Sequence, residues 1–254
     1  MKDFVDKHSI VRNIWGNSDT ILLIFAGASA EFALNKAVDW LYFTGQLPKD
    51  PLSRLFSTVS YARQIVFSDD ESALKAIQKI NTIHTSVENK RGKPIPDWAY
   101  KDVLYMLIDY SLRSYELLER PLSYSEKQEV INVFTKVGKD MGLNELPKTY
   151  SYFDEIRKQH LKQDLNYGAY TKDLYKQYRK HLGIIRYKLL LETQKMLLPK
   201  HVRELLKLRK TGIMYLIIPV YKWCRYLKID KLLKILILPT AYQKDIKALN
   251  IINT

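Results

Sequence analysis

The sequence predicts an all-α protein, built as a single-domain bundle of many helices. Apolar residues recur at helical spacing along almost all of the 254 residues. Glycine and proline, with nine residues each, are scarce, and the chain is rich in leucine, isoleucine, lysine and tyrosine. No segment alternates apolar and polar residues as a half-buried strand would. The length fits one large domain or two small ones, with enough apolar residues to form a core.

The first half of the chain predicts four long helical segments. A helix or a pair of helices spans about residues 17–40, and the turn GQLPKDP follows it. Pro51 is favourable in a first turn, so it opens a helix to about Phe67. The SDDE segment has the pattern of a capping box, with Ser68 as N-cap and Glu71 three residues later, and it should start the next helix. After the loop KRGKPIPD, a long helix is predicted from Asp97 to Glu119.

The second half predicts shorter helices. RPLSYSE should stop one helix and cap another, which ends at Met141–Gly142 because glycine is common just beyond a helix end. NELPKTYSYF is expected to be a connection. Helices rich in lysine and tyrosine then run to about Tyr178 and from Gly183 to Lys210, and the remainder is interrupted by Gly212, Pro219 and Pro239.

Positive charge is concentrated near the C-terminus. Residues 1–154 hold 19 Lys and Arg against 20 Asp and Glu, whereas residues 155–254 hold 22 against 7. The second part is expected to be drawn to anionic surfaces such as phospholipid, nucleic acid or an acidic partner. We expect residues 1–210 to form the helical domain. Residues 211–254 should form basic, apolar helices that pack on this domain or lie at a membrane surface, with Lys222, Arg225, Lys228, Lys231 and Lys234 among them.

Several classes of protein lack their sequence signals here. Cys224 is the only cysteine, so an internal disulfide and a thiolate metal cluster are excluded. The chain has no glycine-rich phosphate loop, no G-x-S-x-G elbow and no H-E-x-x-H motif. Its five histidines are far apart and never spaced as a metal pair. Tyrosines alternate with basic residues between residues 167 and 180, but no nucleic-acid motif accompanies them, so nucleic acid is the third-ranked partner.

Location is predicted from two absences. The N-terminus has mixed charges and no signal-peptide pattern. The most apolar window, IMYLIIPVY, is shorter than the ~20 residues that a spanning helix needs. A cytoplasmic protein, peripheral to a membrane, is expected.

Two polar groups fall on predicted helices. His84 lies within an apolar stripe, so its imidazole should point inward and find a backbone carbonyl, a carboxylate or a metal ion. Arg54 and Thr58 are four residues apart and share a face near Tyr61. That face is either solvated, or buried with a guanidinium and a hydroxyl that meet a carboxylate or a bound oxygen species. Asp109 is expected to be an ion-pair or capping partner. The stripe around His84 consists of Ala73, Ile77, Ile80 and Val87.

Several motifs, taken in order, resemble a family of helical oxygenases that includes rubber-cleaving latex clearing protein and the MpaB-type oxygenase of mycophenolic acid biosynthesis. The family pattern is roughly D-P-x-x-R-L-x-x-T, then I-H-x-x-V on a helix, then L-x-D-S and P-L-S, then G-x-x-x-x-x-L-P. The resemblance covers about residues 8–210 and includes KMLLPKHVRELL. The chain matches at Asp50, Pro51, Arg54, Leu55, Thr58, Ile83, His84, Val87, Leu107, Asp109, Pro121, Leu122, Ser123, Gly142, Leu146 and Pro147.

The resemblance implies a b-type haem in a helical core with one axial histidine. His84 would be that ligand, because neutral imidazole binds haem iron well. Arg54 and Thr58 would lie on the distal side, where the arginine would stabilise negative charge on oxygen and the threonine would donate or relay a proton. An apolar pocket would suit a lipid-like or isoprenoid-like substrate.

The chain departs from the family pattern in its other histidines. Leu104 stands where the family has a histidine before the aspartate, and the first long helix lacks a His-Pro pair. Two hypotheses follow. One is a haem-dependent oxygenase that acts on an apolar substrate near a membrane. The alternative is a non-catalytic binding or scaffold protein of the same fold without haem, in which His84 is only hydrogen-bonded.

Overall fold

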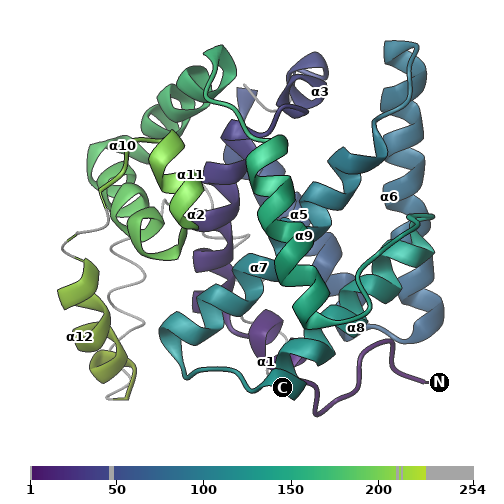
Figure 1. The fold of residues 1–254 in the computed structure, drawn as a ribbon, viewed down its shortest axis with the longest axis horizontal. Helices are drawn as coiled ribbons and strands as arrows, with labels where there is room; N and C mark the ends of the chain where they lie inside the picture. The colour runs from purple at the N-terminus through teal and green to yellow at the C-terminus, as the bar shows by residue number, and fades with distance from the viewer. Residues whose placement is uncertain (1, 46–48, 210–211, 213, 227–254) are drawn as a thin grey trace.

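The computed structural model describes residues 2–45, 49–209, 212 and 214–226 (Figure 1). These residues form α-helices and no β-strand, as the sequence predicted. The described residues also contain two isolated β-bridges, one between Asp3 and Asp69 and one between Asn35 and Leu165. The helices are α1 (Ile10–Gly16), α2 (Ser18–Leu34), α3 (Val38–Phe43), α5 (Pro51–Phe67), α6 (Asp70–Arg91), α7 (Asp97–Leu118), α8 (Tyr124–Asp140), α9 (Tyr150–Gln163), α10 (Ala169–Leu197), α11 (Lys200–Leu205) and α12 (Met214–Tyr226).

The segment predicted as a helix or a pair of helices over residues 17–40 forms the pair α2 and α3, and α1 precedes it unpredicted. Asn17 separates α1 from α2, because its side chain accepts hydrogen bonds from the backbone of Asp19 and Thr20 and so caps α2. Asn35, in an extended conformation, ends α2. Side-chain capping by Asn17 therefore sets the start of α2, and the extended backbone at Asn35 sets its end.

Local capping residues set several other helix ends where the sequence predicted them. Pro51 opens α5 as predicted. RPLSYSE caps α8 as predicted, and the cap is a capping box formed by Ser123 and Glu126. Gly142, with a φ of 90°, follows the predicted end of that helix.

The predicted capping box at Ser68 is wrong. The N-cap of α6 is Asp69, whose carboxylate accepts a hydrogen bond from the Ser72 amide at 3.0 Å. Ser68 is held in an extended conformation because its carbonyl accepts a hydrogen bond from the amide of Phe4. This pairing with the N-terminal segment moves the start of the helix by one residue.

The later helices also begin and end differently from the prediction. NELPKTYSYF is a connection only as far as Thr149, which caps α9. α9 ends at Gln163, and α10 then continues through Gly183 with a kink, since that glycine has a φ of 72° and a ψ of 173°. α10 ends at Leu197, two residues before Pro199.

α2 runs through the centre of the molecule and packs against α7 and α10 (Figure 1). The α2–α7 contact is close because Gly27 faces the ring of Tyr110, where a Cβ atom would lie 2.3 Å from the Tyr110 Cδ1 atom. Large side chains fill the core around this contact, and Trp15, Tyr105, Tyr110, Ile24 and Ile77 are among the fully or almost fully buried ones.

A buried ion network joins α2, α7 and α9. Arg157 donates to both carboxylate oxygens of Glu31, at 2.7 and 2.5 Å, and its Nε atom lies 3.3 Å from Asp109. Tyr110 donates its hydroxyl proton to Glu31 at 3.0 Å. Arg113 also pairs with Asp109, at 2.6 Å. The predicted role of Asp109 as an ion-pair partner for an arginine is therefore confirmed.

α12 contacts the bundle through Arg225, which lies 2.7 Å from Glu119 and 3.4 Å from Asp19. The predicted domain boundary at residue 210, and Lys228, Lys231, Lys234 and Pro239, lie outside the described residues. Of the helices that the structure describes, none combines the length and the apolar character needed to traverse a bilayer.

Candidate functional site

His84 and Arg54 are brought together by the pairing of α5 and α6. The two helices follow each other after a two-residue connection and pack side by side, so the second half of α6 lies beside the start of α5. The positive charge of Arg54 is close enough to lower the pKa of His84. The sequence motif that carries Arg54 and the one that carries His84 therefore meet in space.

The His84 imidazole lies at the edge of the bundle and not at its centre. Ala73 and Ile77 of its stripe are in the core, but His84 and Val87 are only partly buried, and Ile83 is exposed. The second half of α6 thus leaves the core, which the helical spacing alone did not indicate.

The Nδ1 atom of His84 is buried and has no hydrogen-bond partner among the described residues. Its ring meets the Tyr100 ring edge to face, with centroids 5.0 Å apart. Burial, and then the charge of Arg54, lower the pKa of His84 to about 4, while Glu88 opposes this shift. The imidazole is therefore neutral at neutral pH, which is the state that binds a metal ion. Neither the predicted backbone carbonyl nor the predicted carboxylate is bonded to Nδ1 within the part of the chain that the structure describes.

Arg54 and Thr58 are bonded to each other on a partly buried face of α5. The Nη1 atom of Arg54 donates to Thr58 Oγ1 at 2.9 Å and to Ser57 Oγ at 3.2 Å. Thr58 donates its own proton to the Arg54 carbonyl at 3.2 Å. Burial lowers the pKa of Arg54. Among the described residues, no carboxylate lies within ion-pair distance of this guanidinium. The guanidinium is hydrogen-bonded to hydroxyl groups, and no described anion neutralises its charge.

A cleft of about 350 Å³ opens beside His84. It lies between α6, the start of α7 and the end of α8, and its volume is near the lower end for small-molecule sites. Arg54 and Thr58 are not among its lining residues. The structure thus places His84 at the cleft, while Arg54 and Thr58 lie outside its lining. The lining residues are Asn81, His84, Thr85, Ile95, Asp97, Tyr100, Met141, Gly142 and Leu143.

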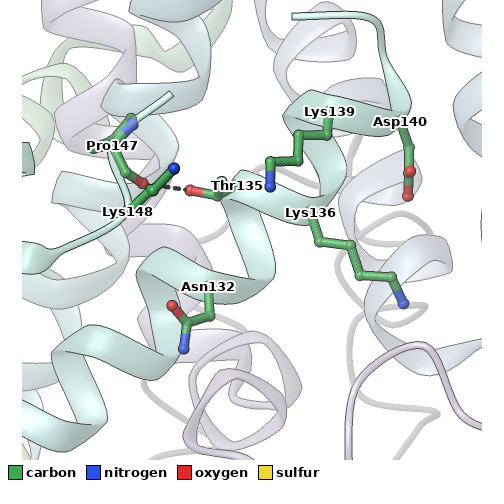
Figure 2. A pocket seen from close by; sticks show the side chains of 7 residues that line it. All are labelled: Asn132, Thr135, Lys136, Lys139, Asp140, Pro147 and Lys148. Carbon is green, nitrogen blue, oxygen red and sulfur yellow. Dashed lines mark hydrogen bonds between the residues drawn. The ribbon is translucent and has the colours of Figure 1, made fainter. Parts of the chain in front are cut away.

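A second hollow, of about 260 Å³, lies on α8 and the loop that follows it (Figure 2). Thr135 donates to the Pro147 carbonyl at 2.9 Å across it, and Lys136 at its rim pairs with Asp70. Lysines and an asparagine form most of the remaining lining, as Figure 2 shows. This hollow holds none of the predicted site residues.

Sequence reasoning missed one cluster. Asp102 of α7 lies against His160 and Asp164 at the end of α9, with the Nδ1 atom of His160 2.5 Å from Asp102 Oδ1 and 3.0 Å from Asp164 Oδ2. The spacing of His160 and Asp164, four residues apart near a helix end, was the available signal. The third member comes from another helix, which no spacing rule within one segment can find.

Comparison with known protein families matches residues 15–216 to the model described as "ER-bound oxygenase mpaB/B'/Rubber oxygenase, catalytic domain". The match spans α2 to α11 and includes the α5–α6 pair and the cleft. No curated protein and no solved structure matches the chain.

Proposed function

Because the chain belongs to the ER-bound oxygenase mpaB/B'/rubber oxygenase catalytic-domain family, we propose that this oxygenase-type domain uses a b-type haem, with His84 as axial ligand, to oxidise an apolar, lipid-like or isoprenoid-like substrate. One observation carries the proposal. The His84 imidazole is neutral, its Nδ1 atom is buried without a partner in the described structure, and its ring lies at the wall of a cleft. A buried polar atom that is left unpaired costs free energy, and a ligand in the site would compensate that cost.

A haem in this site would supply the oxidative chemistry, and the protein groups would bind and orient the reactants. His84 would hold the iron. Burial, and then the fixed positive charge of Arg54, keep the imidazole neutral, and the guanidinium would stabilise negative charge on an oxygen species that reaches it. Thr58 both accepts from the guanidinium and donates to the Arg54 carbonyl, so its first role is to position Arg54.

The apolar character of the substrate is proposed from the family, whose description includes a rubber oxygenase. Ile95, Tyr100, Met141 and Leu143 contribute some apolar surface beside His84, but polar groups make up the larger part of the exposed cleft wall.

The runner-up is a binding or scaffold protein of the same fold that has lost haem. Leu104, which stands at a position of a family histidine, is buried in the core and lies close to Gly138. Nothing polar remains at that position to contact a ligand. The two hypotheses differ in one measurable property, which is stoichiometric haem binding.

Haem reconstitution separates them. We expect the purified, haem-supplied protein to show a Soret band at an equimolar haem content, and His84→Ala to abolish it because no axial nitrogen remains. Arg54→Met should keep the band but shift its position, since a nearby charge tunes the iron. His8→Ala, which changes an exposed histidine, is the matched control and should leave the spectrum unchanged.

Circular dichroism of each variant would show that the helices are intact. A folded, colourless wild-type protein would support the scaffold hypothesis. An unchanged Soret band in His84→Ala would show that the iron is bound elsewhere.

We also propose that the domain contacts an anionic membrane surface through α10. Ile184 and Ile185, directly after the Gly183 kink, are 58% and 77% exposed. Three exposed basic residues lie within two turns of them: Arg179, Lys180 and Lys188. Apolar side chains that enter the headgroup region, with cations around them, match a surface that is both apolar and negatively charged.

Vesicle sedimentation tests this contact. The protein should bind phosphatidylserine vesicles more strongly than phosphatidylcholine vesicles. The double change Ile184→Ser and Ile185→Ser should reduce binding at least about fivefold, because two exposed apolar side chains that would enter the membrane are lost. Leu74→Ser, at an exposed leucine of α6, is the control. Equal binding by the double variant and the wild type would exclude this surface.

A further inference from the structure

Two carboxylates and one imidazole converge where α2, α7 and α9 meet. The Nδ1 atom of His160 lies 2.5 Å from Asp102 and 3.0 Å from Asp164. The ligand atoms of the three side chains all lie within 4.8 Å of one another. Asp102 is almost fully buried, whereas the side chains of His160 and Asp164 are 19% and 16% exposed. The cluster is therefore anchored in the core on one side and accessible to solvent on the other.

A single proton on His160 Nδ1 cannot make a good hydrogen bond to both carboxylates. A ring nitrogen carries at most one hydrogen, so Nδ1 can donate one good hydrogen bond, while two carboxylate oxygens approach it. The second carboxylate then faces another negative charge across a short distance.

The surrounding contacts hold the cluster in place. Asn35 donates to the other oxygen of Asp102 at 2.8 Å, which fixes the orientation of that carboxylate. The amide of Lys36 donates to the backbone carbonyl of Asp164 at 2.9 Å, and the amide of Asn166 donates to the carbonyl of Leu34 at 2.7 Å. The loops after α2 and α9 are thereby joined at the cluster. A supported carboxylate next to an imidazole is typical of metal sites.

We propose that Asp102, His160 and Asp164 bind a divalent metal cation with a preference for nitrogen and oxygen ligands, such as Zn²⁺, at a site separate from His84. A doubly charged cation balances both carboxylates, and neutral imidazole and carboxylate oxygens are ligands that Zn²⁺ accepts. Three protein ligands with one side open leave room for water as the fourth ligand. Ligand atoms bound at about 2.0–2.2 Å lie about 3–3.5 Å apart, so the Asp102–His160 contact of 2.5 Å would lengthen by about 0.5–1 Å.

Metal titration of the full chain, after treatment with a chelator, tests the site. We expect calorimetry to show one equivalent of Zn²⁺, and Co²⁺ to give visible absorption bands typical of a low-coordinate site with nitrogen and oxygen ligands. Asp164→Asn keeps the shape of the side chain but removes the charge, and should weaken Zn²⁺ binding at least about tenfold. His160→Gln should do the same.

Two controls separate this site from others. His8→Gln, at an exposed histidine, should leave affinity unchanged. His84→Ala should also leave it unchanged, so the outcome does not depend on the proposed haem site. The proposal is overturned by a wild-type protein that binds no Zn²⁺, or by Asp164→Asn and His160→Gln variants that bind it as tightly as the wild type. If His160→Gln fails to fold, the Asp164→Asn result alone decides.

Discussion

Replacing Arg157 with methionine should lower the free energy of unfolding by about 3–5 kcal/mol. The guanidinium is buried, with both Glu31 oxygens and Asp109 against it. Methionine would fill much of the volume but leave Glu31 in the core without a counter-charge, and Asp109 would keep only Arg113. Chemical denaturation followed by circular dichroism would measure the loss.

Arg113→Met is the matched control for this prediction. Arg113 also pairs with Asp109, but its side chain is 41% exposed, so its removal should cost no more than about 1 kcal/mol. The triple variant Glu31→Gln, Asp109→Asn and Arg157→Met should recover part of the loss, because it removes the unpaired charges. An Arg157→Met variant as stable as Arg113→Met would show that the buried network contributes little.

Gly27→Ala should destabilise the protein by about 1–3 kcal/mol, even though alanine favours a helix more than glycine does by about 1 kcal/mol. The added methyl group would lie 2.3 Å from the Cδ1 atom and 2.5 Å from the Cε1 atom of Tyr110. That ring is fully buried, and its hydroxyl is bonded to Glu31, so it has little freedom to move. The steric conflict therefore outweighs the helix preference.

Gly168→Ala is the control, because a Cβ atom there meets nothing within 4 Å. It should change stability by less than about 1 kcal/mol. Combining Gly27→Ala with Tyr110→Leu should relieve much of the cost, which a double-mutant cycle by thermal unfolding would measure. Stabilisation by Gly27→Ala alone would show that α2 and α7 can separate easily.

The features that could be predicted from sequence are those determined by neighbours in the chain. Pro51, the Ser123–Glu126 pair and Gly142 act on their own helix ends, and their roles are confirmed. Ser68 was mispredicted because its carbonyl is bonded to Phe4, a contact between distant segments. A capping pattern contains no information about such a contact.

The site shows the same division. The pattern placed His84 on a helix and linked it with Arg54 and Thr58 through the family resemblance. The pattern could not place His84 at the edge of the bundle beside a cleft. One wall of that cleft is formed by the end of α8, which is distant from His84 in the sequence. The pattern identified Asp109 as an ion-pair partner, but it did not show that Arg157 of α9 would pair with it. The Asp102 cluster was missed for the same reason, since its members are on two helices.

One helix, α7, connects three features of the molecule. It carries Tyr100 at the cleft, Asp102 at the carboxylate cluster, and Asp109 and Tyr110 in the ion network. At 1.5 Å per residue, these positions lie within about 15 Å along one axis. A substitution that displaces α7 is therefore expected to disturb the cleft, the carboxylate cluster and the ion network together.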